Sequence, residues 1–221
     1  ILNAQNLEKL DHAREGGIVL LGRFQRADVA LNAVAYRSGD FINIEMEIAS
    51  TSVVDPVQYL MELERATSAM QGAADLTSLC DQAAGVFGEL TGFDRIMVYR
   101  FLDDGSGMVI GEHLSPGAVS YRNHYFPATD IPSQARALFL RNRTRIIPDV
   151  YYTPQHIRAD KDLSQLDLSD SLLRSVSPIH IQYLKNMGVG ASASFSIVID
   201  GALWGMVACH NHEPKLITLS N

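Results

Sequence analysis

Residues 41–48 alternate between apolar and polar side chains along the whole segment. The apolar positions that share one face are Ile42, Ile44, Met46 and Ile48. A repeat of two residues is typical of a β-strand with one buried face. The preceding run, residues 28–36, also has a strand-like composition, and residues 38–40 (SGD) favour a tight turn between the two. We therefore expect a β-hairpin in which residues 41–48 are half-buried.

Beyond residue 50 the hydrophobic pattern predicts a mixture of helices and strands. Asp55 and Pro56 are expected to open one helix, and Asp75 a second that ends at Gly92 and buries Cys80 in the core. The further expected elements are strands at 95–101, 107–113 and near 145–147, helices at 133–141 and 178–187, and a closing hairpin of 191–198 and 202–210 turned at residues 200–201. Antiparallel strands with segregated helices predict an α+β fold. The pattern also divides the chain into expected domains at residues 1–51 and 52–221.

Composition and charge limit the classes of protein that the chain can belong to. It has 221 residues, 47% of them hydrophobic, and a formal net charge of −7. Such a chain can bury a sizeable core, and its negative charge disfavours a nucleic-acid partner. No apolar run approaches the roughly 18 residues that span a bilayer. The two cysteines provide no disulfide framework. We expect a soluble cytoplasmic protein that binds neither nucleic acid nor membrane.

Three short segments each place a titratable side chain inside an apolar stretch. Asp130 lies in residues 127–132 (PATDIP), His180 in residues 177–183 (SPIHIQY), and His210 ends residues 204–210 (WGMVACH). Buried titratable groups are costly unless something pairs with them, and they cluster at functional sites. Structural interpretations also exist. Asp130 can cap the helix that opens near residue 132, and a lone helical histidine is more often a core residue than a ligand.

The order and contexts of these segments resemble the bilin-binding GAF domain of phytochromes, most closely the bacteriophytochromes. The resemblance extends from about Phe93 to Pro214, and residues 1–51 resemble the end of the PAS domain that precedes GAF in that family. It implies a red/far-red photoreceptor fragment that binds a linear tetrapyrrole, expected to be biliverdin, and catalyses no reaction. It also implies a homodimer, with downstream PHY-like and output domains, such as a histidine kinase, in the full-length protein.

The resemblance also implies which residues contact the bilin. In the family the aspartate presents its carbonyl and carboxylate to the ligand, the histidine faces the pyrroles, and the tyrosine lies near the isomerising end ring. Arginines and serines hold the propionates, and aromatic residues surround the end ring. The implied set is Asp130, Ile131, His180, Tyr183, Arg145, Arg174, Ser177, Ser192, Ser194, His210, Tyr99 and Phe126.

One of these positions conflicts with simple strand geometry. A strict two-residue turn at residues 200–201 would pair Cys209 with Ser192, which sends His210 to the opposite face of the sheet. The resemblance needs His210 on the same side as Ser192 and Ser194. A β-bulge in either strand, or a longer turn, would reconcile the two.

The chain departs from the family at the position of covalent attachment. Plant and cyanobacterial phytochromes carry the bilin-linking cysteine immediately before the histidine that matches His180, and here that residue is Ile179. Bacteriophytochromes use a cysteine ahead of the PAS domain, and no such cysteine lies in these 221 residues. Phe139 stands where a tyrosine often contacts a propionate, and Asn211 replaces a frequent histidine. We expect biliverdin to bind this chain without a covalent bond.

Other chemistries agree less well with the sequence. Residues 188–193 (GVGASA) match a loose dinucleotide fingerprint but follow a helix and enter a strand, the reverse of the required order. Residues 209–212 (CHNH) contain possible metal ligands, yet neighbouring strand residues point to opposite faces, so no metal site is predicted. Two alternatives stay open. One is a GAF regulatory module that binds another small molecule, such as a cyclic nucleotide. The other is a thiol reductase, which would need a reactive cysteine pair.

Overall fold

The computed structural model describes residues 3–12, 17–49, 56–160 and 162–217. These residues form two compact units, one from residues 3–12, 17–49, 153–160 and 162–175, the other from residues 56–152 and 176–217. The expected boundary after residue 51 lies outside the described residues, as does the expected helix cap Asp55, so both stay predictions. Among the described residues no helix is long and apolar enough to cross a membrane.

The first unit contains helix α1 (Ala4–His12) and an antiparallel sheet in the order β1-β2-β3. Its strands are β1 (Val19–Arg26), β2 (Val29–Ser38) and β3 (Phe41–Ile48). The expected hairpin is confirmed, since Ser38 pairs with Phe41 across the turn. The expected burial of β3 is wrong at three positions, because Ile42, Met46 and Ile48 are exposed. Helix α1 contacts β1 and β2. Of the four apolar positions on the predicted buried face of β3, only Ile44 packs against the core that Leu10 of α1 forms with these strands.

Residues 153–175 add an irregular segment to the first unit. The Ser38 hydroxyl donates to the Asp167 carbonyl at 3.0 Å, and the Leu172 N–H donates to the Glu45 carboxylate at 3.0 Å. Two long-range hydrogen bonds therefore hold this segment against β2 and β3. Its grouping with the N-terminal strands is not visible in the hydrophobic pattern, because the segment has neither a helical nor a strand repeat.

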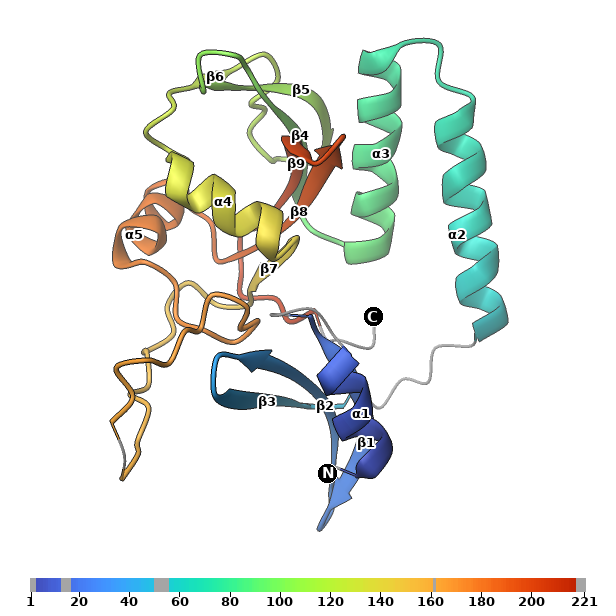
Figure 1. Cartoon of the computed structure of the whole chain (residues 1–221). Coiled ribbons are helices and arrows are strands. Elements are labelled where there is room, and N and C mark those ends of the chain that lie inside the picture. The colour runs from blue at the N-terminus through green and yellow to red at the C-terminus, as the bar shows by residue number, and fades with distance from the viewer. Residues whose placement is uncertain (1–2, 13–16, 50–55, 161, 218–221) are drawn as a thin grey trace. The chain divides into compact units, whose positions relative to one another are not determined.

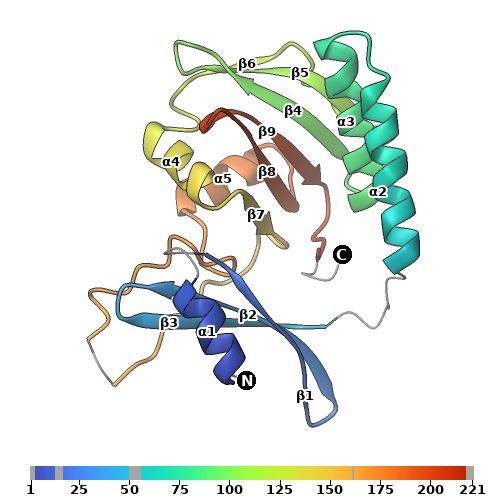
Figure 2. The ribbon, with the colours of Figure 1, turned by 45° about the vertical axis from the view of Figure 1, so that its right-hand side comes forward.

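The second unit is built on a six-stranded antiparallel sheet in the order β6-β5-β4-β9-β8-β7. The strands are β4 (Arg95–Phe101), β5 (Gly107–Leu114), β6 (Tyr125–Phe126), β7 (Thr144–Ile147), β8 (Ala191–Ile199) and β9 (Ala202–Asn211). The helices are α2 (Pro56–Gln71), α3 (Leu76–Thr91), α4 (Ser133–Arg141) and α5 (Pro178–Asn186). Within this unit, Figures 1 and 2 show α2 and α3 on one side of the sheet and α4 and α5 on the other. The α+β prediction is confirmed.

Helix α3 covers one face of this sheet and has the expected ends. Asp75 is its N-cap and accepts a hydrogen bond from the Ser78 N–H, and Gly92 ends it in the left-handed conformation that glycine tolerates. Cys80 and Ala84 face the sheet, where they pack with apolar residues of β4, β8 and β9. Cys80 is thus a core residue, as predicted.

The β8–β9 hairpin resolves the conflict over His210. Asp200 and Gly201 both have positive φ, which gives the tight two-residue turn that strand twist favours. Val198 pairs with Leu203 but Ile197 pairs with Gly205, so Trp204 is an extra residue in β9. This β-bulge shifts the register by one, and Ser192 consequently pairs with His210.

Candidate functional site

The register gives the two faces of the six-stranded sheet different characters, because residues directly opposite each other on neighbouring strands point the same way. One face packs on α3. The opposite face carries two rows across β4, β9 and β8, which are Arg95–His210–Ser192 and Met97–Ala208–Ser194. The next row is Tyr99–Met206–Ser196. We call this nine-residue surface the site face.

Arg95, at the first position of β4, is held on the site face by three neighbours. Its Nη2 lies 3.1 Å from Nδ1 of His210, and its Nη1 donates to the Val119 carbonyl at 3.1 Å. The guanidinium carbon lies 4.5 Å from the centroid of the Tyr121 ring. Burial lowers the pKa of this guanidinium, although Tyr121 and nearby carboxylates act in the opposite direction.

His210 is neutral over the physiological pH range. Burial, the neighbouring Arg95 charge and His180 together lower its pKa to about 3, with burial as the largest cause. Only 8% of the residue is exposed. A neutral imidazole has one donor and one acceptor nitrogen, so His210 contributes a hydrogen-bonding group without a charge.

Asp130 lies in the turn between β6 and α4, where its backbone N–H donates to the Pro127 carbonyl at 3.0 Å. Its carboxylate accepts a hydrogen bond from the Tyr183 hydroxyl. Helix α4 begins without a side-chain cap, so the alternative in which Asp130 caps this helix is wrong. Burial and the Asp130 charge raise the pKa of Tyr183 to about 12, and the same two causes raise the pKa of Tyr99 to about 12.

His180 lies beside Tyr183 on one side of α5, as their spacing of three residues predicts. The two rings stack with their centroids 6.2 Å apart and an interplanar angle of 10°. Part of the imidazole surface is exposed, yet the surrounding protein atoms and the Arg145 charge lower its pKa. Arg145 itself pairs with Ser194 across β7 and β8. The structure therefore brings His180, Tyr183 and Arg145 to the same region as Asp130 and His210.

Aromatic and aliphatic side chains form an apolar cluster at the β4–β5 end of the site face. Tyr99 packs edge-on against Phe101 at 5.2 Å between ring centroids and lies 5.8 Å from Phe126. Tyr121 lies 6.0 Å from Phe126. The other members are Met97, Val109, Met206, Ala208, Ile131 and Phe139. Tyr99, Phe126 and Ile131, all predicted site residues, meet in this cluster.

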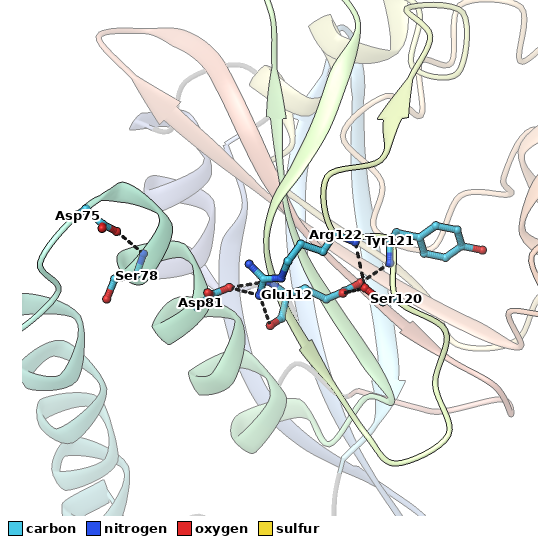
Figure 3. A network of polar contacts seen from close by, with 7 residues as sticks. All are labelled: Asp75, Ser78, Asp81, Glu112, Ser120, Tyr121 and Arg122. Atoms are coloured by element: carbon cyan, nitrogen blue, oxygen red, sulfur yellow. Dashed lines mark hydrogen bonds and ion pairs between the residues drawn. The ribbon is translucent and has the colours of Figure 1, made fainter.

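A network of ionised groups fixes the loop that carries Tyr121 (Figure 3). Asp81 of α3 accepts from Arg122 Nη2 at 2.6 Å and from the Glu112 N–H at 3.0 Å. The Glu112 carboxylate accepts from the Ser120 hydroxyl at 2.5 Å and from the Tyr121 N–H at 2.8 Å. Burial alone would raise the pKa of Asp81, but the Arg122 and Glu112 hydrogen bonds and the Arg122 charge lower it. These contacts hold residues 120–122 against β5 and α3 and place the Tyr121 ring beside the Arg95 guanidinium.

The remaining predicted residues differ in their surroundings. Ser192 is buried beside His210, and Ser194 is half-buried beside Arg145. Ser177 precedes α5, is exposed and does not cap the helix. Arg174 belongs to the first compact unit, where its Nη1 donates to the carbonyls of Ser169 at 2.6 Å and Ser171 at 2.9 Å. Its role toward a ligand stays a prediction.

Arg95 and Tyr121 are members of the site that the sequence analysis did not identify. Arg95 lies two residues before Met97 and four before Tyr99 on the same strand. Strand alternation therefore places it on the face of Tyr99, and this signal was available in the sequence. Tyr121 lies in a loop with no hydrophobic repeat, so its position follows from tertiary contacts with Glu112, Arg95 and Phe126.

Comparison with known proteins identifies the family. A family profile for the GAF domain matches residues 75–220. The chain is 42% identical over 177 residues to a bacteriophytochrome of Pseudomonas aeruginosa, a match that covers 79% of this chain and 24% of that protein. It is 40% identical over 193 residues to cyanobacterial phytochrome B of Nostoc, which covers 86% of this chain and 26% of that protein. The chain thus spans about a quarter of the length of these curated relatives.

Solved structures agree with the sequence relatives. The chromophore-binding domain of a wild-type Stigmatella aurantiaca phytochrome is 36% identical, with a TM-score of 0.85 and coverage of 98% of this chain and 71% of that one. The chromophore-binding domain of an unusual bacteriophytochrome from R. palustris is 39% identical, with a TM-score of 0.83 and coverage of 99% and 73%. The chain therefore belongs to the phytochrome family, and its residues 75–220 form a GAF domain.

Proposed function

We propose that this chain binds a linear tetrapyrrole, biliverdin, against the site face and serves as the red/far-red light-sensing part of a photoreceptor. The single observation that carries this proposal is the juxtaposition of Asp130, His180 and His210 beside an aromatic cluster. The relatives named phytochromes and bacteriophytochromes support the same assignment.

The chemistry of the residues suits such a ligand. A bilin supplies an extended conjugated system that absorbs red light and isomerises at one double bond. Its flat apolar body suits the cluster around Tyr99 and Phe126. A protonated pyrrole system needs a nearby acceptor, and the Asp130 carboxylate and carbonyl are acceptors. Propionates need cations, and Arg145 is a cation beside His180.

Each residue then has a defined task. Asp130 accepts hydrogen bonds from ligand N–H groups, and Tyr183 holds its carboxylate in place. His180 and His210 contribute uncharged imidazoles, since their pKa values are lowered. Arg145 binds a propionate of the ligand. Three hydroxyls donate hydrogen bonds to the propionates, those of Ser192, Ser194 and Ser177. The aromatic cluster packs against one end of the ligand.

The wider roles follow from the family and are part of the proposal. This chain catalyses no reaction, and the full-length protein carries PHY-like and output domains and acts in the cytoplasm. It forms a homodimer. Exposed apolar side chains on α2 and α3 support dimer formation, and they include Leu60, Met61, Leu63, Leu76 and Leu90. Sedimentation velocity of the chain measures the oligomeric state directly.

An absorption spectrum after addition of biliverdin tests the proposed function. We expect a red band that changes under red illumination, whereas the matched variant Asp130→Ala should weaken the band or abolish its light response. A cyclic nucleotide added in parallel serves as the competing ligand. If biliverdin produces no red band and the nucleotide binds in a calorimetric titration, the alternative of a regulatory GAF module replaces this proposal.

The predicted propionate contacts are tested by separate replacement of the two arginines. Arg145→Ala should weaken biliverdin binding by about 1.5–3 kcal/mol, the range for hydrogen bonds to charged groups, and the same is predicted for Arg174→Ala. Fluorescence-quenching titrations measure both affinities. Arg100→Ala is the matched control, because Arg100 lies on β4 next to Trp204 and points away from the site face. Parent-like affinity for both variants would contradict the propionate role.

A further inference from the structure

The contact between Arg95 and His210 constrains where the proton of the imidazole lies. A guanidinium group has five N–H donors and no acceptor. Its Nη2 lies 3.1 Å from His210 Nδ1, which is hydrogen-bonding distance. Two donors cannot share one hydrogen bond, so Nδ1 must be the unprotonated nitrogen. A neutral His210 then carries its proton on Nε2.

We infer that Arg95 is a positioning residue that holds His210 in the Nε2–H tautomer, so that the site face presents a fixed N–H donor at this position. The structure gives Nε2 no hydrogen-bond partner among the described residues, so this donor is available to a ligand. A ligand acceptor, such as a carbonyl oxygen, is the group that it suits.

Among the residues that the structure describes, no other group contacts the Nδ1 side of His210 and could fix its tautomer. The charged and titratable groups near the ring are Arg95 of β4 and His180 of α5, and Ser192 of β8 lies opposite it. Burial, the Arg95 charge and the neighbouring His180 all disfavour a second proton on the ring, which agrees with its low pKa of about 3. His210 therefore stays a neutral donor rather than becoming a cation.

Arg95 can fix the tautomer because it is itself held. Its Nη1 donates to the Val119 carbonyl, and its guanidinium lies over the Tyr121 ring. Both neighbours belong to the loop that Glu112 and the Asp81–Arg122 ion pair tie to β5 and α3. Figure 3 shows the Tyr121 ring directed away from that network, while its N–H points toward Glu112. The donor on the site face thus depends on groups that do not contact a ligand.

The proposal is tested on the ligand-free chain by nitrogen NMR of ¹⁵N-labelled histidines. The His210 signals are assigned by their absence from His210→Gln. We expect the parent chain to show a protonated Nε2 and an unprotonated Nδ1, unchanged between about pH 5 and pH 8. A protonated Nδ1 in the parent would overturn the inference without any further variant.

Replacement of Arg95 tests its positioning role. In Arg95→Met the His210 signals should show a mixture of tautomers in the same pH range. Arg100→Met is the matched control, since it removes an arginine of the same strand from the opposite face and should leave the His210 signals as in the parent. If Arg95→Met fails to fold, Tyr121→Leu, which removes the ring beneath the guanidinium, should shift the tautomers in the same direction. An unchanged Nε2–H tautomer in the folded variant would overturn the role of Arg95.

The consequence for binding rests on the proposed function and is measured separately. Loss of one well-oriented donor should weaken biliverdin binding by roughly two- to tenfold in Arg95→Met but not in Arg100→Met. If the parent chain fails to bind biliverdin, the proposed function falls, whereas the NMR result on the tautomer stands by itself.

Discussion

At the scale of single residues, the pKa values of both histidines are lowered, although only His210 is a buried residue. The Asp130 carboxylate and the Arg145 guanidinium lie in the same region. His210 lies deep beside Arg95, and His180 lies near Arg145, so each imidazole has a cationic neighbour that disfavours its own protonation. Asp130 has the opposite kind of neighbour, a tyrosine hydroxyl that donates to its carboxylate. The site therefore offers a hydrogen-bond acceptor at Asp130 and uncharged imidazoles at His180 and His210.

Because the pKa of His210 is lowered in the folded chain, the free energy of unfolding depends on pH. The unfolded chain takes up a proton near pH 6.5, whereas folded His210 takes one up only near its pKa of about 3. Stability is therefore complete above about pH 6.5 and is lost as the pH falls toward 3. At about pH 4 the loss should be roughly 3 kcal/mol. His210→Gln should flatten this slope in urea unfolding followed by fluorescence of Trp204, the only tryptophan. Parallel slopes for parent and variant would contradict the assigned pKa.

Asp130 and His180 are predicted to hold the protonated ligand between them. A cation in an apolar environment needs an acceptor, which Asp130 supplies, and the neutral imidazole of His180 offers a second acceptor nitrogen. Asp130→Ala and His180→Ala should keep the fold but lower the pKa of the bound bilin or abolish its light response. The measurement is a pH titration of the red band, with far-ultraviolet circular dichroism as the check on folding. Parent-like titration and photoconversion in both variants would make the pair structural.

The sequence indicated candidate site residues that belong to short local motifs. Asp130, His180 and Tyr183 stand in local motifs, and the spacing of three between the last two predicts their stacking correctly. Arg95 was missed because an arginine at the start of a strand is usually a surface residue. Its burial arises from Val119, Tyr121 and His210, which are 24, 26 and 115 residues away in the chain.

At the scale of elements, the position of His210 depends on one extra residue in β9. The hairpin turn and its strands were predicted correctly, yet strand alternation with a strict two-residue turn gave His210 the wrong face. A bulge or a longer turn was needed to correct it. The structure places that bulge at Trp204. A bulge leaves little trace in the hydrophobic pattern, because it changes the register without changing the composition.

Close approach of β4 and β9 next to the bulge disfavours a side chain at Gly205. A methyl group there would lie 2.3 Å from the Tyr99 carbonyl oxygen of β4, so the strands would have to separate. Gly205→Ala should lower the free energy of unfolding by roughly 1–3 kcal/mol. Gly85→Ala in α3 is the matched control, since nothing lies within 4 Å of the added methyl group. That change should raise stability by about 0.5–1 kcal/mol. Equal effects of the two substitutions in urea unfolding would contradict the packing argument.

At the scale of the whole molecule, segments that are neighbours in the sequence do not always belong to the same compact unit. Residues 153–175 follow most of the GAF strands in sequence but group with the N-terminal strands. The α+β class and the family were predictable, because they rest on element types and on three local motifs. The grouping of residues 153–175 was not, since it depends on long-range hydrogen bonds such as Leu172 to Glu45.

Whether this chain can attach its ligand covalently is also a property of the whole molecule, because it depends on every cysteine that the chain contains. Its two cysteines, Cys80 of α3 and Cys209 of β9, are both buried in the core between α3 and the sheet. Burial raises the pKa of Cys209 to about 12, and burial with the Asp81 charge raises the pKa of Cys80. The thiolate is the reacting species, so neither side chain is a suitable nucleophile. We therefore expect these 221 residues to bind biliverdin without a thioether bond.

A denaturing gel with zinc-enhanced bilin fluorescence measures the presence of an adduct. The parent chain should give no fluorescent protein band although it shows the red absorption band in solution. Ile179→Cys is the positive control, because Ile179 is 82% exposed at the start of α5 and occupies the position that carries the linking cysteine in plant and cyanobacterial phytochromes. This variant should give a fluorescent band with biliverdin or a related bilin. A band on the parent that disappears in Cys209→Ser or Cys80→Ser would identify a buried cysteine as the attachment site and contradict the prediction.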